Sequence, residues 1–457
     1  MDDNGTVVID LGSDRYDPPV EDEGRPLALP AHRWRAAALA LVGALALTAG
    51  GAAPPAPSPL RDVYAVPLTV DDRFLLTGDR LYVADRPAGG EARIAAYDLT
   101  GRRIWSVPQP AGEPLQLSEA PGLLLSTSND PGDRSVRTTA LDAVTGRPLW
   151  SFPDWLTALP GTSTALVTND VFPPESRFEP GEPVPAAPVL HVASDGTTYT
   201  AESIGVTAQV VDLATGAVLW RTPLVSAAIA LPAGGGREPV VLVSPREGGV
   251  ELRDPRTGAV RWSLDRSVPP VRYAAQFGDV LLLSRTGRDA GLAAYSTDLG
   301  QRLWEATKPD LHSPHFGVCA PMLCTSDPDN GVEVRDPATG AVAWRMARTG
   351  SLQPSGSGLV VSDEQPRVHR VVDPGTGRTV ADLTAWREAD SSPSEPAPLL
   401  LRRQTDTRQT WLGLLAPGAT AVRTLDVVPH ALSFCAVVPG VVACHADERE
   451  VRVWRYE

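Results

Sequence analysis

The sequence predicts an all-β protein, a single β-propeller of four-stranded blades that follows one N-terminal transmembrane helix. Three observations predict this fold. A hairpin with a glycine turn recurs at intervals of about forty residues, the period of a propeller blade. The 457 residues include 45 Pro and 40 Gly, which suits many short strands joined by turns. One uncharged stretch precedes the first hairpin and has the composition of a membrane-spanning helix.

Residues 1–32 are predicted to form a disordered, acidic tail in the cytoplasm. Acidic residues outnumber basic ones in this segment, and it has several prolines and few apolar side chains. Such a segment cannot bury enough apolar surface to offset the entropy of folding. A short apolar island at residues 7–12 is a candidate docking motif for a cytoplasmic partner. The alternative is a tail without a specific partner.

Residues 33–53 are predicted to form a transmembrane signal-anchor helix. Residues 36–53 carry no charge and are about long enough to cross the ~30 Å hydrocarbon core. Arg33 and Arg35 precede this stretch, and no basic cluster follows it closely, which places the N-terminus in the cytoplasm. The alternative is a signal peptide cleaved near the small residues at 51–53. Residues 54–60 are rich in proline and predict a stiff spacer.

Residues 61–457 carry the repeat, which is clearest at residues 334–344. An Asp before each turn can accept hydrogen bonds from backbone N–H groups, and a Gly supplies the positive φ that closes the hairpin. Six of the eleven Trp residues stand four positions after such a Gly, so we interpret them as wedges between neighbouring blades. The turn and wedge residues are Asp142, Gly146 and Trp150; Asp212, Gly216 and Trp220; Asp254, Gly258 and Trp262; and Asp336, Gly340 and Trp344. Degenerate copies surround Gly377, where Ala381 takes the Trp position, and Gly418.

The last blade is predicted to borrow a strand from the beginning of the domain. The C-terminal sequence provides only three strands, at residues 432–438, 441–445 and 451–456. Residues 62–67 have the pattern of a lone strand before the first blade. We therefore expect residues 62–67 to form the missing outer strand, which removes an exposed sheet edge.

One interval between turn glycines, from Gly146 to Gly216, is longer than the others. The excess lies at residues 171–205 and is rich in proline. Long loops on rigid scaffolds often carry function, so this insertion is a candidate binding element. The alternative is a surface insertion without a role.

The four cysteines fall into two close pairs, Cys319 with Cys324 and Cys435 with Cys444. Each pair flanks an apparent hairpin turn, and cysteines opposite each other across a hairpin can reach disulfide geometry. A location outside the cytoplasmic membrane also favours two disulfides. A zinc site formed by Cys319, Cys324, His312 and His315 is the alternative, but its spacing does not match a metal knuckle.

The turn Asp-x-x-Thr-Gly, followed by a strand that ends in Trp, resembles the repeat of the pyrroloquinoline-quinone (PQQ)-type propellers. The resemblance covers about residues 62–457 and implies eight blades, with seven or nine as alternatives. That family includes quinone-dependent dehydrogenases and the BamB-like lipoproteins of outer-membrane assembly. The whole layout resembles membrane-anchored BamB-like proteins of actinobacteria. The chain has no adjacent cysteine pair of the dehydrogenase kind and no lipid-attachment cysteine.

These observations predict a non-catalytic scaffold with no cofactor and no metal. It is held at the cell membrane by residues 33–53, with the propeller outside, and it binds a protein or a cell-envelope component through blade loops and the 171–205 insertion. One alternative is a sensor that signals through the helix to the tail. A quinone-dependent dehydrogenase is a weaker alternative. The net charge of −14 argues against nucleic acid as a partner.

Overall fold

The computed structural model describes residues 58–85, 91–109, 112–130, 135–178, 191–225, 231–232, 241–243, 249–264, 271–285, 291–307, 319–327, 331–346, 351–356, 358–362, 367–391, 397–405 and 407–457. The chain divides into two compact units, Met1–Pro57 and Ser58–Glu457. The predicted tail, the predicted anchor and most of the predicted spacer lie outside the described residues. No helix among the described residues is long and apolar enough to cross a membrane.

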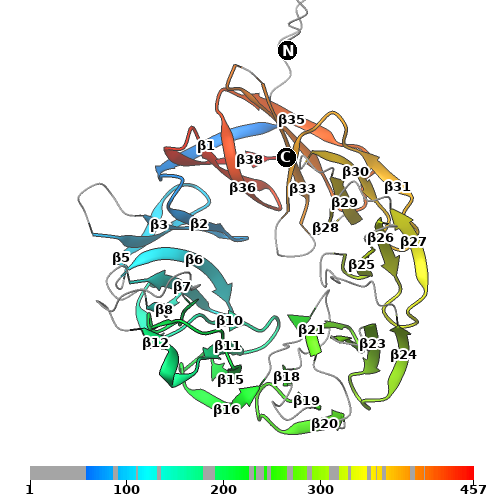
Figure 1. Cartoon of the computed structure of the whole chain (residues 1–457). Helices are drawn as coiled ribbons and strands as arrows, with labels where there is room; N and C mark the ends of the chain where they lie inside the picture. The colour runs from blue at the N-terminus through cyan, green and yellow to red at the C-terminus, as the bar shows by residue number, and fades with distance from the viewer. Residues whose placement is uncertain are drawn as a thin grey trace, which may run out of the picture. The chain divides into compact units, whose positions relative to one another are not determined.

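The second unit consists of β-strands, which form successive antiparallel sheets that Figure 1 traces by colour from blue to red. The first three sheets contain β2 (Arg73–Leu76), β3 (Arg80–Asp85), β4 (Arg93–Asp98) and β5 (Arg103–Pro108); β6 (Glu113–Ala120), β7 (Leu123–Asn129), β8 (Val136–Asp142) and β9 (Pro148–Phe152); and β10 (Thr157–Ala158), β11 (Thr164–Val171), β15 (Gly205–Asp212) and β16 (Val218–Val225).

The fourth to sixth sheets contain β18 (Val241–Val243), β19 (Val250–Arg253) and β20 (Val260–Leu264); β21 (Val271–Phe277), β22 (Val280–Arg285), β23 (Gly291–Ser296) and β24 (Arg302–Thr307); and β25 (Leu323–Asp327), β26 (Gly331–Arg335) and β27 (Val342–Met346). A short strand, β17 (Leu231–Pro232), adds to the fifth sheet by pairing with β21 in parallel.

The last three sheets contain β28 (Ser351–Ser355), β29 (Gly358–Ser362), β30 (Val368–Val372) and β31 (Thr379–Asp382); β32 (Glu388–Ser391), β33 (Leu399–Gln404), β34 (Thr410–Leu415) and β35 (Arg423–Val428); and β36 (Leu432–Val438), β37 (Val441–Ala446), β38 (Glu450–Tyr456) and β1 (Leu60–Pro67). A small insertion sheet holds β12 (Arg177–Phe178), β14 (Thr198–Tyr199) and β13 (His191–Val192), preceded by the 3₁₀ helix η1 (Pro174–Ser176).

The core consists of separate clusters of buried side chains, each of them between two neighbouring sheets. The second strand of a sheet is often a short run of buried apolar residues, as at Leu281, Leu282 and Leu283 of β22, because both of its faces are covered. In one of these clusters, Ile94 of the first sheet packs with Leu124 and Leu141 of the second. Each sheet therefore depends on its neighbour to bury one of its faces.

The predicted closing strand is confirmed. β1 pairs antiparallel with β38, from Leu60 opposite Tyr456 to Pro67 opposite Glu450, and Figure 1 shows the blue β1 beside the red β38. The ninth sheet also packs on the first, since Val66 and Val441 belong to the same buried cluster as Leu81. The N-terminal and C-terminal ends of this unit are thus held in one sheet.

Nine sheets of the repeated kind are present in the described part of the chain, one more than the expected eight and equal to one of the alternatives. The difference arises after Ala381, where the turn and wedge residues become degenerate. Two complete sheets still form there, because Leu400, Leu412 and Val442 bury one sheet on the next without the repeat's signature residues.

Candidate functional site

The repeated turn has the same geometry in successive sheets, and Asp142 shows it well. Asp142 Oδ1 accepts hydrogen bonds from Val144 N at 3.1 Å, Thr145 N at 2.8 Å and Thr145 Oγ1 at 2.9 Å. These bonds to Thr145 and Val144 lower the pKa of Asp142, because they stabilise its carboxylate form. Gly146 N also donates to Asp142 O at 2.8 Å. Asp142 Oδ1 therefore accepts its hydrogen bonds from within its own turn.

Asp212, Asp254 and Asp336 are placed in the same way, and each Oδ1 accepts from the N–H of the Thr three residues later. Partial burial raises the pKa of Asp254, but hydrogen bonds from Arg261 and Thr257 outweigh it and lower that pKa to about 2. A β-bulge lies one or two residues before the Asp in each of these hairpins. A bulge of this kind bends the strand and increases its twist next to the turn.

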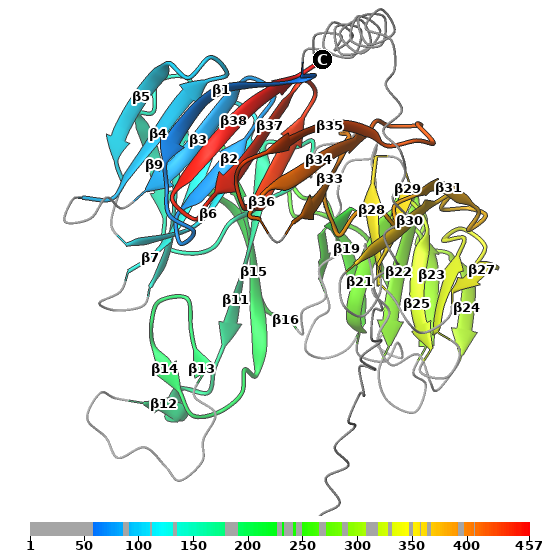
Figure 2. The same ribbon diagram turned by 90° about the horizontal axis from the view of Figure 1, so that it is seen from above.

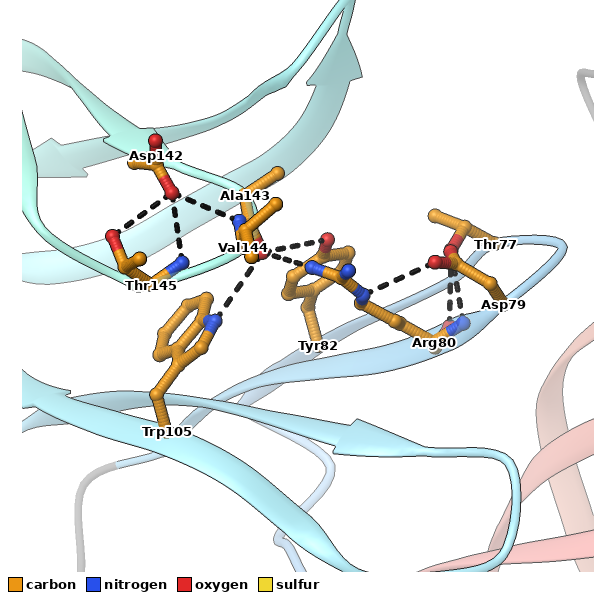
Figure 3. Close-up of polar contacts among 9 residues, drawn as sticks. All are labelled: Thr77, Asp79, Arg80, Tyr82, Trp105, Asp142, Ala143, Val144 and Thr145. Carbon is orange, nitrogen blue, oxygen red and sulfur yellow. Dashed lines mark hydrogen bonds and ion pairs between the residues drawn. The ribbon is translucent and has the colours of Figure 1, made fainter.

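Each wedge tryptophan crosses to the turn of the next sheet. Trp105 Nε1 donates to Ala143 O at 3.3 Å, where Arg80 and Tyr82 also donate to the same carbonyl (Figure 3). A Cβ added to Gly146 would lie 2.5 Å from the Trp105 indole. Gly146 is therefore required both for its φ of +74° and for the space that the indole occupies.

The predicted wedges lie in this position. Trp150, Trp220, Trp262, Trp304 and Trp344 donate to Leu213 O, Pro255 O, Thr297 O, Pro337 O and Pro374 O at 2.8–3.0 Å. Their indoles lie against Gly216, Gly258, Gly300, Gly340 and Gly377. These residues form the seams between sheets and leave little of the indole for a ligand.

Two seams use residues that the sequence analysis did not single out. Tyr64 of β1 lies against Gly101, with its Cγ 2.7 Å from the position of an added Cβ, so it replaces Trp between the ninth and first sheets. Burial raises the pKa of Tyr64, and its hydroxyl has no hydrogen-bond partner among the described residues. After Ala381, Trp386 instead fills the space beside Gly413. An aromatic residue on the lone N-terminal strand was the available signal for Tyr64.

The insertion has a small folded core. Phe172 stacks on Tyr199 with ring centroids 4.5 Å apart, and His191 lies 6.0 Å from Phe172. Figure 2 shows β12, β13 and β14 beyond the ends of β11 and β15, where the insertion leaves the third sheet. The sequence predicted a proline-rich loop here, and the described residues form a three-stranded sheet instead. Residues 179–190 lie outside the description.

A buried aspartate fastens the insertion to the second sheet. Asp154 Oδ2 accepts from Ser194 Oγ at 3.0 Å, and Ser194 O accepts from Val136 N at 2.7 Å. Asp154 Oδ1 accepts from Trp155 N at 2.7 Å. Burial raises the pKa of Asp154 and outweighs these hydrogen bonds. We call this contact the latch, Asp154 with Ser194; no sequence motif marks it.

Two exposed apolar side chains are close in sequence to the latch residues. Trp155 is 40% exposed and Val192 is 44% exposed, and both are within two residues of a latch residue. Exposed apolar side chains that gather into one patch are typical of interaction surfaces, and these two residues are candidates for such a patch. The described part of the insertion is therefore held to the second sheet at the latch and exposes the apolar side chain of Val192.

Both predicted disulfides are present. Cys435 of β36 pairs with Cys444 of β37, with Cα atoms 4.1 Å apart. Cys319 bonds to Cys324 across the turn before β25, with Cα atoms 5.7 Å apart. No group of His, Cys, Asp and Glu in the described residues could hold a metal ion, and His312 and His315 lie outside them.

Phe434, beside the second disulfide, departs from the repeat. It is 65% exposed and has a φ of +43°, which is unfavourable for a bulky residue. The bulge between Ser433 and Cys435 holds it there, with its ring edge toward the buried His445, 6.3 Å away. Burial lowers the pKa of His445, whose Nδ1 has no hydrogen-bond partner among the described residues. Strained, exposed residues of this kind cluster at binding sites.

Comparison with known proteins identifies the repeat. Residues 132–313 match a PQQ-type family model described as outer membrane protein assembly factor BamB. Residues 132–313 of this chain are therefore similar to the PQQ-type propeller repeat. No curated protein matches it. Among solved structures, BamB from Moraxella catarrhalis is 15% identical with a TM-score of 0.40, and the match covers 87% of this chain and 98% of that one. The computationally designed Ika8 protein is also 15% identical, with a TM-score of 0.42 and coverage of 76% and 98%.

Proposed function

We propose that this protein is a non-catalytic scaffold that binds a protein or a cell-envelope component outside the cytoplasmic membrane. The observation that carries the proposal is the latched insertion, which is fixed to the second sheet through Asp154 and Ser194 and exposes Val192. A fixed apolar element loses little conformational entropy when a partner covers it. The matching family model is described as an assembly factor, which agrees with a binding role.

The proposed absence of catalysis rests on how the prominent carboxylates are used. One carboxylate oxygen, Oδ1, of each of Asp142, Asp212 and Asp336 accepts hydrogen bonds within its own turn, which gives these residues a structural role. A general base must lie within hydrogen-bond reach of the proton that it removes. These aspartates stabilise the turns of the repeat.

Two further parts of the proposal concern architecture. We propose that the nine sheets form a closed propeller, supported by the pairing of β1 with β38 and the packing of Val66 and Val441 with Leu81. We also propose that residues 33–53 anchor it in the membrane. Deletion of residues 33–53 is expected to move the chain from the membrane pellet to the soluble fraction after alkaline extraction; retention in the pellet would contradict the anchor.

Site-specific photocrosslinking in intact cells tests the binding surface. A photoreactive amino acid replaces Val192 in the full-length chain, and the control replaces Val144, which is 61% exposed in the turn of the second sheet. We expect a discrete crosslinked partner from position 192 and none from position 144. The same adducts from both positions, or none from either, would contradict binding by the insertion.

A further inference from the structure

A cavity of about 400 Å³ lies where the repeat becomes degenerate, between the turn that follows β34 and the turn that follows β36. Its volume is in the range of small-molecule sites. The residues that line it are Pro398, Leu414, Ala416, Pro417, Ala419, Ala421, Arg423, Pro439, Gly440 and Tyr456. The cavity is distinct from the insertion and from the seams with tryptophan.

The loss of the wedge pattern leaves this turn open. In the seventh sheet, Gly377 is covered by the Trp344 indole, 2.6 Å from the position of an added Cβ. In the eighth sheet, nothing lies within 4 Å of the same position at Gly418. The neighbouring turn glycine, Gly440, is equally open. The missing wedge at Gly418 therefore leaves space that an indole occupies in the earlier sheets, whereas the turn at Gly440 is open in the same way as the corresponding turns at Gly122, Gly161 and Gly278.

The walls of the cavity are mainly apolar. Leu414 and the prolines offer no side-chain hydrogen bond, and Tyr456 uses its hydroxyl to donate to Val438 O at 2.8 Å. Burial raises the pKa of Tyr456, so the phenol stays neutral and presents its ring to the cavity. A ligand for this space needs an apolar body.

Arg423 is the single charged residue in the lining. Its side chain is exposed, and its guanidinium has no hydrogen-bond or ion-pair partner among the described residues. A guanidinium presents several donors in a planar fork that matches a carboxylate. The chain has a net charge of −14, so its overall electrostatic field does not attract anions. Attraction of an anion to this cavity would therefore come from Arg423 itself.

We propose that this cavity binds a small amphipathic carboxylate, with its apolar part between the two turns and its carboxylate on Arg423. The cavity, its apolar walls and an arginine with no ion-pair partner among the described residues support this site, which is independent of partner binding by the insertion. Entry of the apolar part removes its surface from water, and the ion pair sets the orientation.

Calorimetric titration of the full-length chain with 4-phenylbutyrate tests the proposal, with the neutral 4-phenylbutanol as the matched probe. We expect saturable binding of one carboxylate per chain and at least tenfold weaker binding of the alcohol. Arg423→Gln should weaken carboxylate binding at least tenfold and leave the alcohol unchanged. Arg103→Gln, at an exposed arginine of β5, is the control and should bind as the unaltered chain does.

A second variant tests the space independently of the charge. Ala421→Trp at the rim should fill the cavity and abolish binding of both probes, with an unchanged thermal midpoint showing that the chain is folded. The proposal would be overturned if the unaltered chain bound both probes with equal affinity, or if Arg423→Gln bound the carboxylate as tightly as the unaltered chain does. Binding of the carboxylate that never saturates would also overturn it. Since Arg423 is exposed, its replacement leaves the packing intact and the charge test stands by itself.

Discussion

The seam geometry makes a quantitative prediction at Gly377, in the turn between β30 and β31. Its φ is +69°, and a Cβ there would lie 2.6 Å from Trp344 Cδ2 of the preceding sheet. Gly377→Ala should therefore destabilise the protein in two ways. The left-handed backbone costs about 1–2 kcal/mol for a residue with a Cβ, and displacing the packed indole costs about 1–3 kcal/mol more.

Gly418 offers a matched control in the following sheet. Its φ is +75°, but no atom lies within 4 Å of an added Cβ. Gly418→Ala should carry only the backbone cost, about 1–2 kcal/mol. The difference between the two variants isolates the contact with Trp344, because their backbone conformations are nearly the same.

Urea denaturation of the full-length variants, followed by tryptophan fluorescence and circular dichroism, measures these costs. In a Trp344→Ala background, Gly377→Ala should cost no more than Gly418→Ala does, which gives a coupling of about 1–3 kcal/mol between the two positions. Equal costs for Gly377→Ala and Gly418→Ala would refute the wedge interpretation. So would a cost at Gly377 that is unchanged when the indole is absent.

Three further predictions follow from the same contacts. Asp154→Asn keeps an acceptor oxygen for Ser194 but cannot ionise. Because the folded protein raises the Asp154 pKa, the folded state binds this proton more tightly than the unfolded state, and stability falls as pH rises from the ordinary value through the raised one. The denaturation midpoint of Asp154→Asn should therefore lose that fall, which begins as pH rises above the ordinary aspartate value of about 3.9; a pH profile equal to that of the unaltered chain would show that Asp154 is not the titrating group. Phe434→Gly should leave stability unchanged or raise it by about 1 kcal/mol, since it relieves an unfavourable φ at an exposed site, whereas a loss above that amount would show that Phe434 is needed for packing. Tyr64→Phe removes a buried hydroxyl that has no partner among the described residues and should raise the thermal midpoint, while Tyr64→Ala opens the seam between the ninth and first sheets and should cost about 3–5 kcal/mol; a lower midpoint for Tyr64→Phe would show that the hydroxyl is bonded.

The parts of the fold that were predictable are those encoded within one repeat. An Asp, a Gly and a Trp at fixed spacing identify the hairpin, because the turn bonds of Asp142 and the φ of Gly146 are local properties. The closing strand was also predictable, because a count of strands in the last unit is one short. The number of sheets was harder to obtain, since the eighth and ninth sheets rely on ordinary leucines and valines such as Leu400 and Val442.

The candidate sites were less predictable because they join residues from different repeats. The insertion was identifiable by its length, but the latch depends on Asp154 and Ser194 meeting across the fold, 3.0 Å apart. Phe434 appeared in the sequence as an ordinary strand residue. Its exposure results from a bulge beside Cys435, and a bulge has no signature without its partner strand.

The seams also explain where binding sites can arise in this protein. Wherever Trp covers the next turn glycine, the indole N–H is bonded to a carbonyl and the surface between the sheets is filled, as at Trp344 and Pro374. The repeat therefore stabilises the unit by using up the groups that could recognise a ligand. Where the wedge is missing, between Ala381 and Gly418, the turn at Gly418 keeps space, and the nearby Arg423 has no ion-pair partner among the described residues. The missing wedge thus opens the space in which we propose that a carboxylate binds.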